Sequence, residues 1–205
     1  MADAARPLQT ADPAETARAR AAAEDAALLS RYGAGDAAAA RALVARLGPG
    51  VLALARRLTG DTAEAEDITQ EAMLRLWQIA PRWQAGQAAP ASWLHRVTVN
   101  LAIDRLRRRR GVALDAIAEP AAPDPPPSEA LIDADRARAL EAALAQLPER
   151  QRIAVVLRHI EGYANPEIAA LLDIGVEAVE SLTARGKRRL ADLLAPRRDE
   201  LGYDR

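Results

Sequence analysis

The spacing of apolar positions along the chain predicts helices. Between residues 61 and 79, apolar side chains recur every three or four residues, which places them on one side of a helix. That stripe comprises Ala65, Ile68, Ala72, Leu76 and Ile79. Asp61 followed by Glu64 is a typical helix start, and Pro81 prevents the helix from continuing. The opposite side is polar apart from Leu74, so this helix should bury one face only.

The N-terminal part of the chain is more broken. Residues 1–24 contain little to bury, so we expect a mobile tail that is partly helical from Ala14. Glycines then interrupt the pattern at 33–35, and glycines flanking Pro49 interrupt it again. Short helices are therefore expected at 24–33, 36–47 and 51–59.

A longer helix is expected from Trp93 to Arg110, with Ser92 as its N-cap. Residues 111–128 follow, rich in proline and acids, and cannot support a core. This stretch is predicted to be an extended acidic linker that spans at most roughly 60 Å. It separates a domain at 25–110 from a second domain at 129–195, which a C-terminal tail at 196–205 follows.

The second domain ends in a helix-turn-helix pattern. Helices are expected at 129–146, 148–160, 166–172 and 176–194. Asn165 would cap the third helix, with Pro166 at its first position. A tight turn at 173–175 joins a short helix to a longer one with basic residues, which is typical of helix-turn-helix proteins.

Composition supports an all-α protein of two small helical domains. Half of the 205 residues are apolar, yet only 3% are aromatic and Phe is absent. Ala, Leu, Arg and Glu dominate, and all four favour helices. Without cysteine there can be no disulfide and no thiolate metal site. No apolar run approaches the roughly 18–20 residues of a membrane span, and a signal-peptide core is missing. We therefore expect a cytoplasmic protein without membrane insertion.

The net charge of −1 conceals a strong segregation of charge. Residues 105–110 contain five arginines, and residues 185–189 are also basic. Residues 111–135 carry acids but neither Lys nor Arg. Two basic patches separated by an acidic stretch indicate a polyanion held at two places. The alternatives are arginines that merely complement a helix dipole and a plain helical hairpin with a solvated basic end.

The sequence does not indicate catalytic chemistry. Gly186 and Lys187 lack the upstream glycine of a phosphate-binding loop, and His95 and His159 fall in different predicted domains. Asp67 and Glu71 could resemble a metal-binding pair, but like charges are common on an exposed helix face. We therefore expect neither an enzyme nor a cofactor or metal site.

Taken in order, these segments resemble the extracytoplasmic-function (ECF) group of sigma-70-type sigma factors. Residues 67–77 resemble the helix that binds core RNA polymerase, and residues 93–107 resemble the −10 recognition helix. The opening of the −35-binding domain is similar to residues 147–152 and 161–169. The resemblance implies a protein that redirects core RNA polymerase to particular promoters and that is commonly held inactive by an anti-sigma factor.

The resemblance also implies a role for each exposed face. The clamp helices of the polymerase's largest subunit would be bound by Asp67, Gln70, Glu71, Leu74 and Arg75. The flap of the polymerase would be a further contact. Together with the loop 82–91, the −10 element would be read by Arg96, Asn100, Asp104, Arg105 and Arg108. Asn100 is the favoured base reader because amides pair with base edges. The −35 element would be bound by Ser181, Arg185, Lys187 and Arg188.

Some positions depart from the family pattern. Glu180 and Leu182 stand where many relatives carry basic residues, Asp173 replaces a turn glycine, and Gly175 replaces a capping serine. We therefore expect −35 binding to an unusual sequence, in which Glu180 accepts from a cytosine amine and Leu182 touches a thymine methyl. A free-standing DNA-binding regulator and a protein-binding adaptor are the rival interpretations. The helix at 61–77 favours the sigma factor, because a simple repressor has no need of it.

Overall fold

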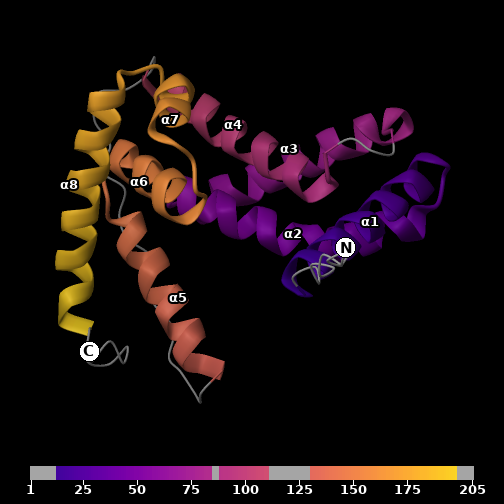
Figure 1. Cartoon of the computed structure of the whole chain (residues 1–205), viewed down its shortest axis with the longest axis horizontal. Helices are drawn as coiled ribbons and strands as arrows, with labels where there is room; N and C mark the ends of the chain where they lie inside the picture. The colour runs from indigo at the N-terminus through magenta and orange to yellow at the C-terminus, as the bar shows by residue number, and fades with distance from the viewer. Residues whose placement is uncertain (1–12, 85–87, 111–129, 198–205) are drawn as a thin grey trace, which may run out of the picture.

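The protein is described by a computed structural model for residues 13–84, 88–110 and 130–197. Over these residues it contains helices and no strand, so the predicted all-α class is confirmed. Figure 1 shows two groups of helices side by side. The first group comprises α1 (Pro13–Gly33), α2 (Ala37–Thr59), α3 (Thr62–Ile79), the 3-10 turn η1 (Ala80–Arg82) and α4 (Pro90–Arg110). The second comprises α5 (Ala130–Ala145), α6 (Glu149–Val155), the π turn η2 (Val156–Ile160), α7 (Asn165–Leu172), α8 (Val176–Leu194) and the 3-10 turn η3 (Ala195–Arg197).

The first group is built around α2, which packs against α1, α3 and α4. Its interior is lined by leucines and isoleucines interleaved with alanines that have no exposed surface: Ala55, Ala65 and Ala72. Small side chains at these positions let the helix backbones approach closely. The predicted start of α3 is confirmed, because the Asp61 carboxylate accepts a hydrogen bond of 2.9 Å from the Glu64 backbone N–H.

The N-terminal helices differ from the prediction. The expected break around Pro49 is wrong, since α2 runs through it without interruption. Leu43 and Val51, on either side of that proline, are buried in the same core. Their packing outweighs the cost of an interior proline, which is about 3 kcal/mol. The break at Gly33–Gly35 is present, and the Asp36 side chain caps α2.

Residues 13–24, which the sequence assigned to a mobile tail that is partly helical from Ala14, belong to α1, so the helical part of that prediction is confirmed. The following turn of that helix is anchored, because Asp25 is only 4% exposed and its carboxylate lies 2.7 Å from Arg46 Nε on α2. A charged pair between two helices has no signature in the local pattern of either helix. The rest of the predicted tail, residues 1–12, lies outside the described residues.

The helix α4 begins at Pro90, three residues before the predicted start. Ser92 therefore lies inside its first turn, and the expected Ser92 N-cap is wrong. The backbone N–H of Trp93 donates to the Ala89 carbonyl at 3.0 Å, which closes this turn. Proline suits the first position of a helix because the N–H that it lacks would have no partner there.

The second group is held together by the contact of α6 with α8. Gly186 of α8 is the point of closest approach: a Cβ atom there would lie 2.6 Å from Val155 Cγ2 and 3.1 Å from the Gln151 carbonyl oxygen. Any larger side chain would push the two helices apart. The π turn η2 extends α6 to Ile160, the end that the sequence predicted.

The helix-turn-helix lies where the sequence predicted it, with α7 and α8 joined by residues 173–175. Asp173 occupies the left-handed region, with φ of 54°. The start of α7 differs by one residue, since Ala164 and not Asn165 is the N-cap. Ala164 has no polar side chain, so Glu167 stabilises this helix end by accepting the Ala164 N–H at 2.7 Å.

The two groups of helices contact one another. The C-terminal half of α2 meets α5 and α6, and α4 meets α7 (Figure 1). Buried apolar residues of both groups form one continuous cluster. The predicted linker between the groups, residues 111–128, lies outside the described residues.

Helix α2 is long and apolar enough to cross a membrane by length and composition, with a mean hydropathy of 1.4 over its most apolar window. Its most apolar window contains Arg41 and Arg46, so the expectation that no uninterrupted apolar run approaches that length is not contradicted. Alanines raise the mean, whereas the larger side chains, such as Leu43, Leu54 and Leu58, are buried against neighbouring helices. The burial of those side chains is that of a core helix in a bundle.

Candidate functional site

The outer face of α4 carries a row of exposed polar residues. Arg96, Asn100, Asp104 and Arg108 are all exposed and follow one another at intervals of four residues, so they share one side of the helix. Arg105 does not join them, because it turns toward α3. Its Nη1 lies 3.5 Å from Asp67 Oδ2 and 3.5 Å from the Glu64 carbonyl oxygen. Arg105 therefore links the predicted −10 face to the predicted polymerase face.

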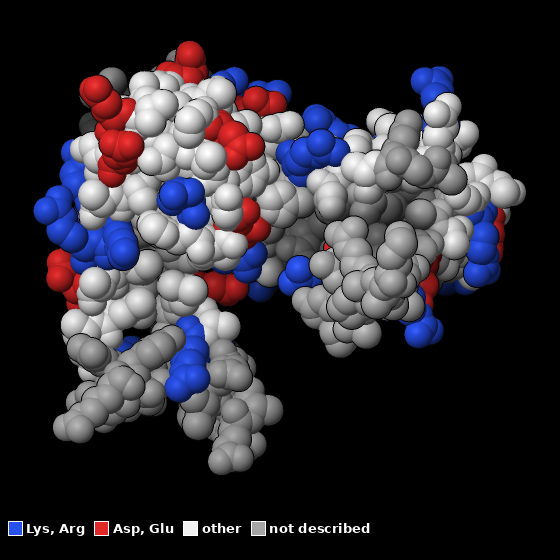
Figure 2. Space-filling view, viewed as in Figure 1, with Lys and Arg blue, Asp and Glu red and all other residues white. Residues whose placement is uncertain are grey.

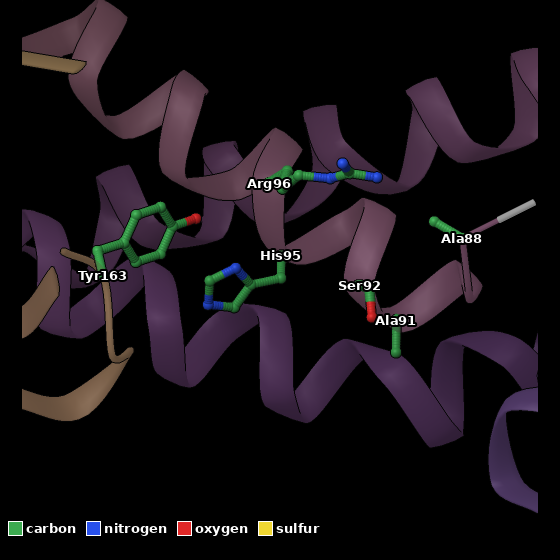
Figure 3. A pocket seen from close by; sticks show the side chains of 6 residues that line it. All are labelled: Ala88, Ala91, Ser92, His95, Arg96 and Tyr163. Carbon is green, nitrogen blue, oxygen red and sulfur yellow. The ribbon is translucent and has the colours of Figure 1, made fainter. Parts of the chain in front are cut away.

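An open hollow of about 570 Å³ lies beside the first turns of α4. It is lined by Ala88, Ala91, Ser92, His95, Arg96 and Tyr163. Figure 3 shows the rings of His95 and Tyr163 next to each other at one end of the hollow. Their centroids are 6.0 Å apart and the planes are inclined by 17°. Tyr163 comes from the loop before α7, so the second group of helices supplies one wall.

The outer face of α3 holds the predicted polymerase-binding residues together. Asp67, Gln70, Leu74 and Arg75 are exposed, and Glu71 is half-buried. Leu74 exposes 55% of its surface although it is a large apolar residue. Arg75 Nε lies 2.9 Å from Glu71 Oε1, an ion pair one turn apart. An apolar side chain ringed by polar groups is a common centre of a protein interface.

The outer face of α8 brings together three of the four predicted −35 residues. Ser181, Arg185 and Arg188 are exposed and lie on one side of the helix at intervals of four and three residues. Lys187 lies on another side of the helix. The pKa of His159 is lowered by burial and then by the charges of Lys187 and Arg158. Figure 2 shows basic side chains along the α8 side of the molecule, at the left of the view.

Glu180 and Leu182, the two residues of α8 that depart from the family pattern, lie in different environments. Leu182 is only 9% exposed and packs in the interior, so the expected contact with a thymine methyl is wrong. That contact was expected because Leu182 stands where many relatives carry basic residues, but neighbouring helix residues point about 100° apart, and Leu182 does not share the exposed face of Ser181. Glu180 is exposed, and its Oε1 accepts from Asn165 Nδ2 at 3.4 Å.

Comparison with known proteins identifies both groups of helices. The family model of sigma-70 region 2 matches residues 43–112, and that of sigma-70 region 4 matches residues 137–190. The ECF RNA polymerase sigma factor SigM of Mycobacterium tuberculosis is 39% identical over 142 residues, which cover 67% of this chain and 68% of SigM. The chain belongs to the ECF sigma factor family.

One further relative and one solved structure are also similar to the chain. SigE of Mycolicibacterium smegmatis is 38% identical over 148 residues, which cover 70% of this chain and only 57% of SigE. Among solved structures, the sigma factor RpoE in complex with the anti-sigma factor NepR from Bartonella quintana matches with a TM-score of 0.48 and 23% identity. That match covers 76% of this chain and 96% of RpoE.

The contact between region 2 and region 4 contains polar residues that sequence reasoning missed. Glu161, just after η2, lies between two residues of region 2. Its Oε1 is 3.0 Å from Arg57 Nη2, and its Oε2 is 2.7 Å from His95 Nε2. The pKa of Glu161 is lowered, first by the hydrogen bond from His95 and then by Arg57, against the opposing effect of burial. Burial and the charge of Glu161 raise the pKa of Tyr163.

Arg152 is the second polar element of that contact. It is only 6% exposed. Its guanidinium donates to the Leu58 carbonyl at 3.1 Å and to the Thr59 carbonyl, the last two of α2. It also donates to the Leu147 carbonyl of its own region, at 3.3 Å. No signal in the sequence could pair Arg152 with Leu58, because 94 residues separate them.

Within the described residues no group of three or more His, Asp or Glu side chains is placed to hold a metal ion. The acids on α3 and α4 are instead spread along exposed helix faces or paired with arginines.

Proposed function

We propose that this sigma factor binds core RNA polymerase and directs it to promoters by contacting a −10 element with region 2 and a −35 element with region 4. The observation that carries the proposal is the order of three exposed faces, on α3, α4 and α8, within a chain that belongs to the ECF family. The side chains of each face complement those of its proposed partner. These side chains are largely exposed and do not belong to the hydrophobic core.

The face of α3 would dock on the clamp helices of the polymerase's largest subunit. Leu74 would be the apolar anchor, and Asp67, Gln70, Glu71 and Arg75 would form the polar rim. The ion pair between Arg75 and Glu71 holds two of these side chains in place before binding. The flap would provide a separate contact for region 4.

The face of α4 would read the −10 element. Arg96 and Arg108 offer positive charge for phosphates, and Asn100 between them offers the donor and acceptor that match a base edge. The hollow beside Ser92 and Arg96 lies at the end of this row, where an unstacked base could enter. Arg105 would act by fixing α4 against α3.

The face of α8 would bind the −35 element. A helix fits the major groove, where Arg185 and Arg188 could reach base edges or phosphates and Ser181 could hydrogen-bond to either. Glu180 lies nearby and would accept from a cytosine amine after releasing Asn165. Lys187, on another side of α8, would contribute at most to the general positive field.

We further propose that the protein acts in the cytoplasm, has no catalytic activity of its own, and is controlled by an anti-sigma factor, as expected for a member of its family. A free-standing DNA-binding regulator would need α8 alone and would leave the exposed Leu74 without a role.

Reconstitution with purified core RNA polymerase tests the proposal. We expect the protein to form a complex with core polymerase and to give transcripts from a restricted set of promoters, which can be found by mapping 5′ ends after overexpression. Core polymerase alone is the control. A protein that binds promoter DNA without core polymerase, and that yields no specific transcript with it, would instead be a free-standing regulator.

A further inference from the structure

The contact between region 2 and region 4 combines buried apolar residues with specific polar contacts. Arg152 reaches across to the carbonyl end of α2, and Glu161 reaches across to Arg57 and His95. Arg107 of α4 donates to the Leu171 carbonyl of α7 at 2.8 Å. Hydrogen bonds of charged groups at one joint fix the relative orientation of the two regions, as buried apolar surface alone would not.

Each polar group in this contact meets a partner of opposite charge or partial charge. Arg152 places its positive charge at the end of α2, where the helix dipole is negative. The side chain of Glu161 is only 11% exposed, and its two oxygens take one partner each. The side chain of Arg57 is 23% exposed. The side chain of His95 is 32% exposed, so the pairs are partly withdrawn from water, where charge pairs are stronger than at an open surface.

The joint also requires a particular residue in region 2. Gly60 ends α2 with φ of 67°, and a Cβ atom there would lie 2.6 Å from Arg152 Nη1. Only glycine at this position leaves room for the guanidinium of Arg152 beside the last turn of α2. The C-terminal end of α2, within region 2, therefore forms a binding site for the Arg152 side chain of region 4.

The closed arrangement places the two DNA-reading helices too close together for a promoter. Arg107, at the end of α4, touches α7, and α7 packs directly on α8. Helices in contact lie about 8–10 Å apart, so this end of α4 is about 20 Å from α8. The −10 and −35 elements lie about 25 base pairs apart, which is about 85 Å along B-form DNA. Both elements cannot be bound in this arrangement.

We infer that the free sigma factor holds itself closed: Arg57, His95, Arg152 and Glu161 form a latch that keeps region 4 on region 2, and the latch must open before both promoter elements are bound. The inference rests on the proposed function for its consequence, although the closure itself does not. Tyr163 of region 4 would also hinder −10 binding in the closed form, because it forms a wall of the hollow beside Arg96 on the proposed −10 face.

A charge swap tests the latch. Arg57→Glu places two acids together, and Glu161→Arg places two cations together, so each should open the joint. The double variant Arg57→Glu/Glu161→Arg restores one opposite pair and should close it again. Asp135→Asn is the matched control, because it removes an exposed ion pair with Arg138 that lies within α5.

Closure is measured as a distance between spin labels. The chain has no cysteine, so labels on Ala38→Cys in α2 and Ala142→Cys in α5, both exposed positions, report only this distance. We expect a narrow distribution for the unaltered background, the double variant and the Asp135→Asn control, and a broad, longer one for each single variant. Equally broad distributions in all proteins would overturn the latch.

The consequence is measured as transcription with core polymerase at increasing sigma factor concentration. A protein whose competent form is rarely populated shows an apparent affinity reduced by that fraction. Each single variant should therefore reach half-maximal transcription at roughly tenfold lower concentration, with the same maximum, and the double variant should return to the original value. Equal half-maximal concentrations together with normal transcripts would overturn the inhibitory role and leave the proposed function standing. No transcript from any of the proteins would overturn the proposed function, and the inhibitory role with it, while the label distances would still decide whether the latch closes.

Discussion

Replacing Gly60 with alanine should destabilise region 2 through two separate costs. The backbone at Gly60 has φ of 67°, a conformation that costs a residue with a side chain about 1 kcal/mol relative to glycine. The added Cβ would also lie 2.6 Å from Arg152 Nη1, so the guanidinium must leave the Leu58 and Thr59 carbonyls. Hydrogen bonds from a charged group contribute about 1.5–3 kcal/mol. The sum predicts a loss of about 2.5–4 kcal/mol in the free energy of unfolding.

Gly162→Ala is the matched control for the backbone cost. Gly162 has φ of 77°, close to that of Gly60, and an added Cβ would meet nothing within 4 Å. Its cost should therefore be only about 1 kcal/mol. The difference between the two variants measures the loss of the Arg152 contacts.

Urea unfolding followed by tryptophan fluorescence measures the effect on the correct part of the chain. All three tryptophans, Trp77, Trp83 and Trp93, lie in region 2. Circular dichroism of the same samples reports all helices and shows whether region 4 unfolds in the same transition. In the Arg152→Ala background the part of the Gly60→Ala cost that comes from losing the Arg152 hydrogen bonds should disappear, and only the backbone cost of about 1 kcal/mol should remain. Equal losses for Gly60→Ala and Gly162→Ala in the unaltered background would show that Arg152 does not contact α2 in solution, and the reasoning would fail.

Four further substitutions test the proposed faces and one local feature. Leu74→Asp should weaken the complex with core polymerase by about 2 kcal/mol or more, because it removes an apolar anchor from α3, and wild-type affinity in a co-purification titration would remove this face from the interface. Asn100→Ala should slow promoter opening, measured by permanganate reactivity, while core binding is retained, and unchanged opening on every promoter would refute the assignment. Arg185→Ala should weaken −35 binding by about 1–3 kcal/mol if it bonds a base edge, and an unchanged footprint would contradict that contact. Asp173→Gly should stabilise region 4 by up to about 1 kcal/mol, because φ of 54° then carries no side-chain penalty, and a lower thermal midpoint would show that the Asp173 side chain has another role.

Much of the local structure follows from the sequence. The apolar stripe of α3 and its Asp61 cap define that helix, and both are present in the structure. The helix-turn-helix was also predictable, because the chain ends one helix, turns within three residues and begins another. These features depend on residues a few positions apart, so local pattern and capping chemistry are sufficient to determine them.

Two other local predictions failed because packing between helices determines whether a helix continues and which of its faces is buried. Pro49 is a helix breaker by itself, yet the core that holds Leu43 and Val51 carries α2 through it. Leu182 stands beside predicted DNA-binding residues in the chain, but the orientation of α8 on α6 turns it inward. Which face of a helix is buried depends on the helix that it meets.

The sequence by itself determined the all-α class, most helix ends, the helix-turn-helix, the family and three candidate faces. The tertiary structure alone decided that region 4 rests on region 2. The residues responsible, such as Arg57 with Glu161 and Arg152 with Leu58, are 104 and 94 positions apart. The physical reason is that a charged side chain shows its own chemistry in the sequence but not its partner, since any of many oppositely charged groups or carbonyls could meet it. Only the packing of complete helices selects one of them and removes the pair from water.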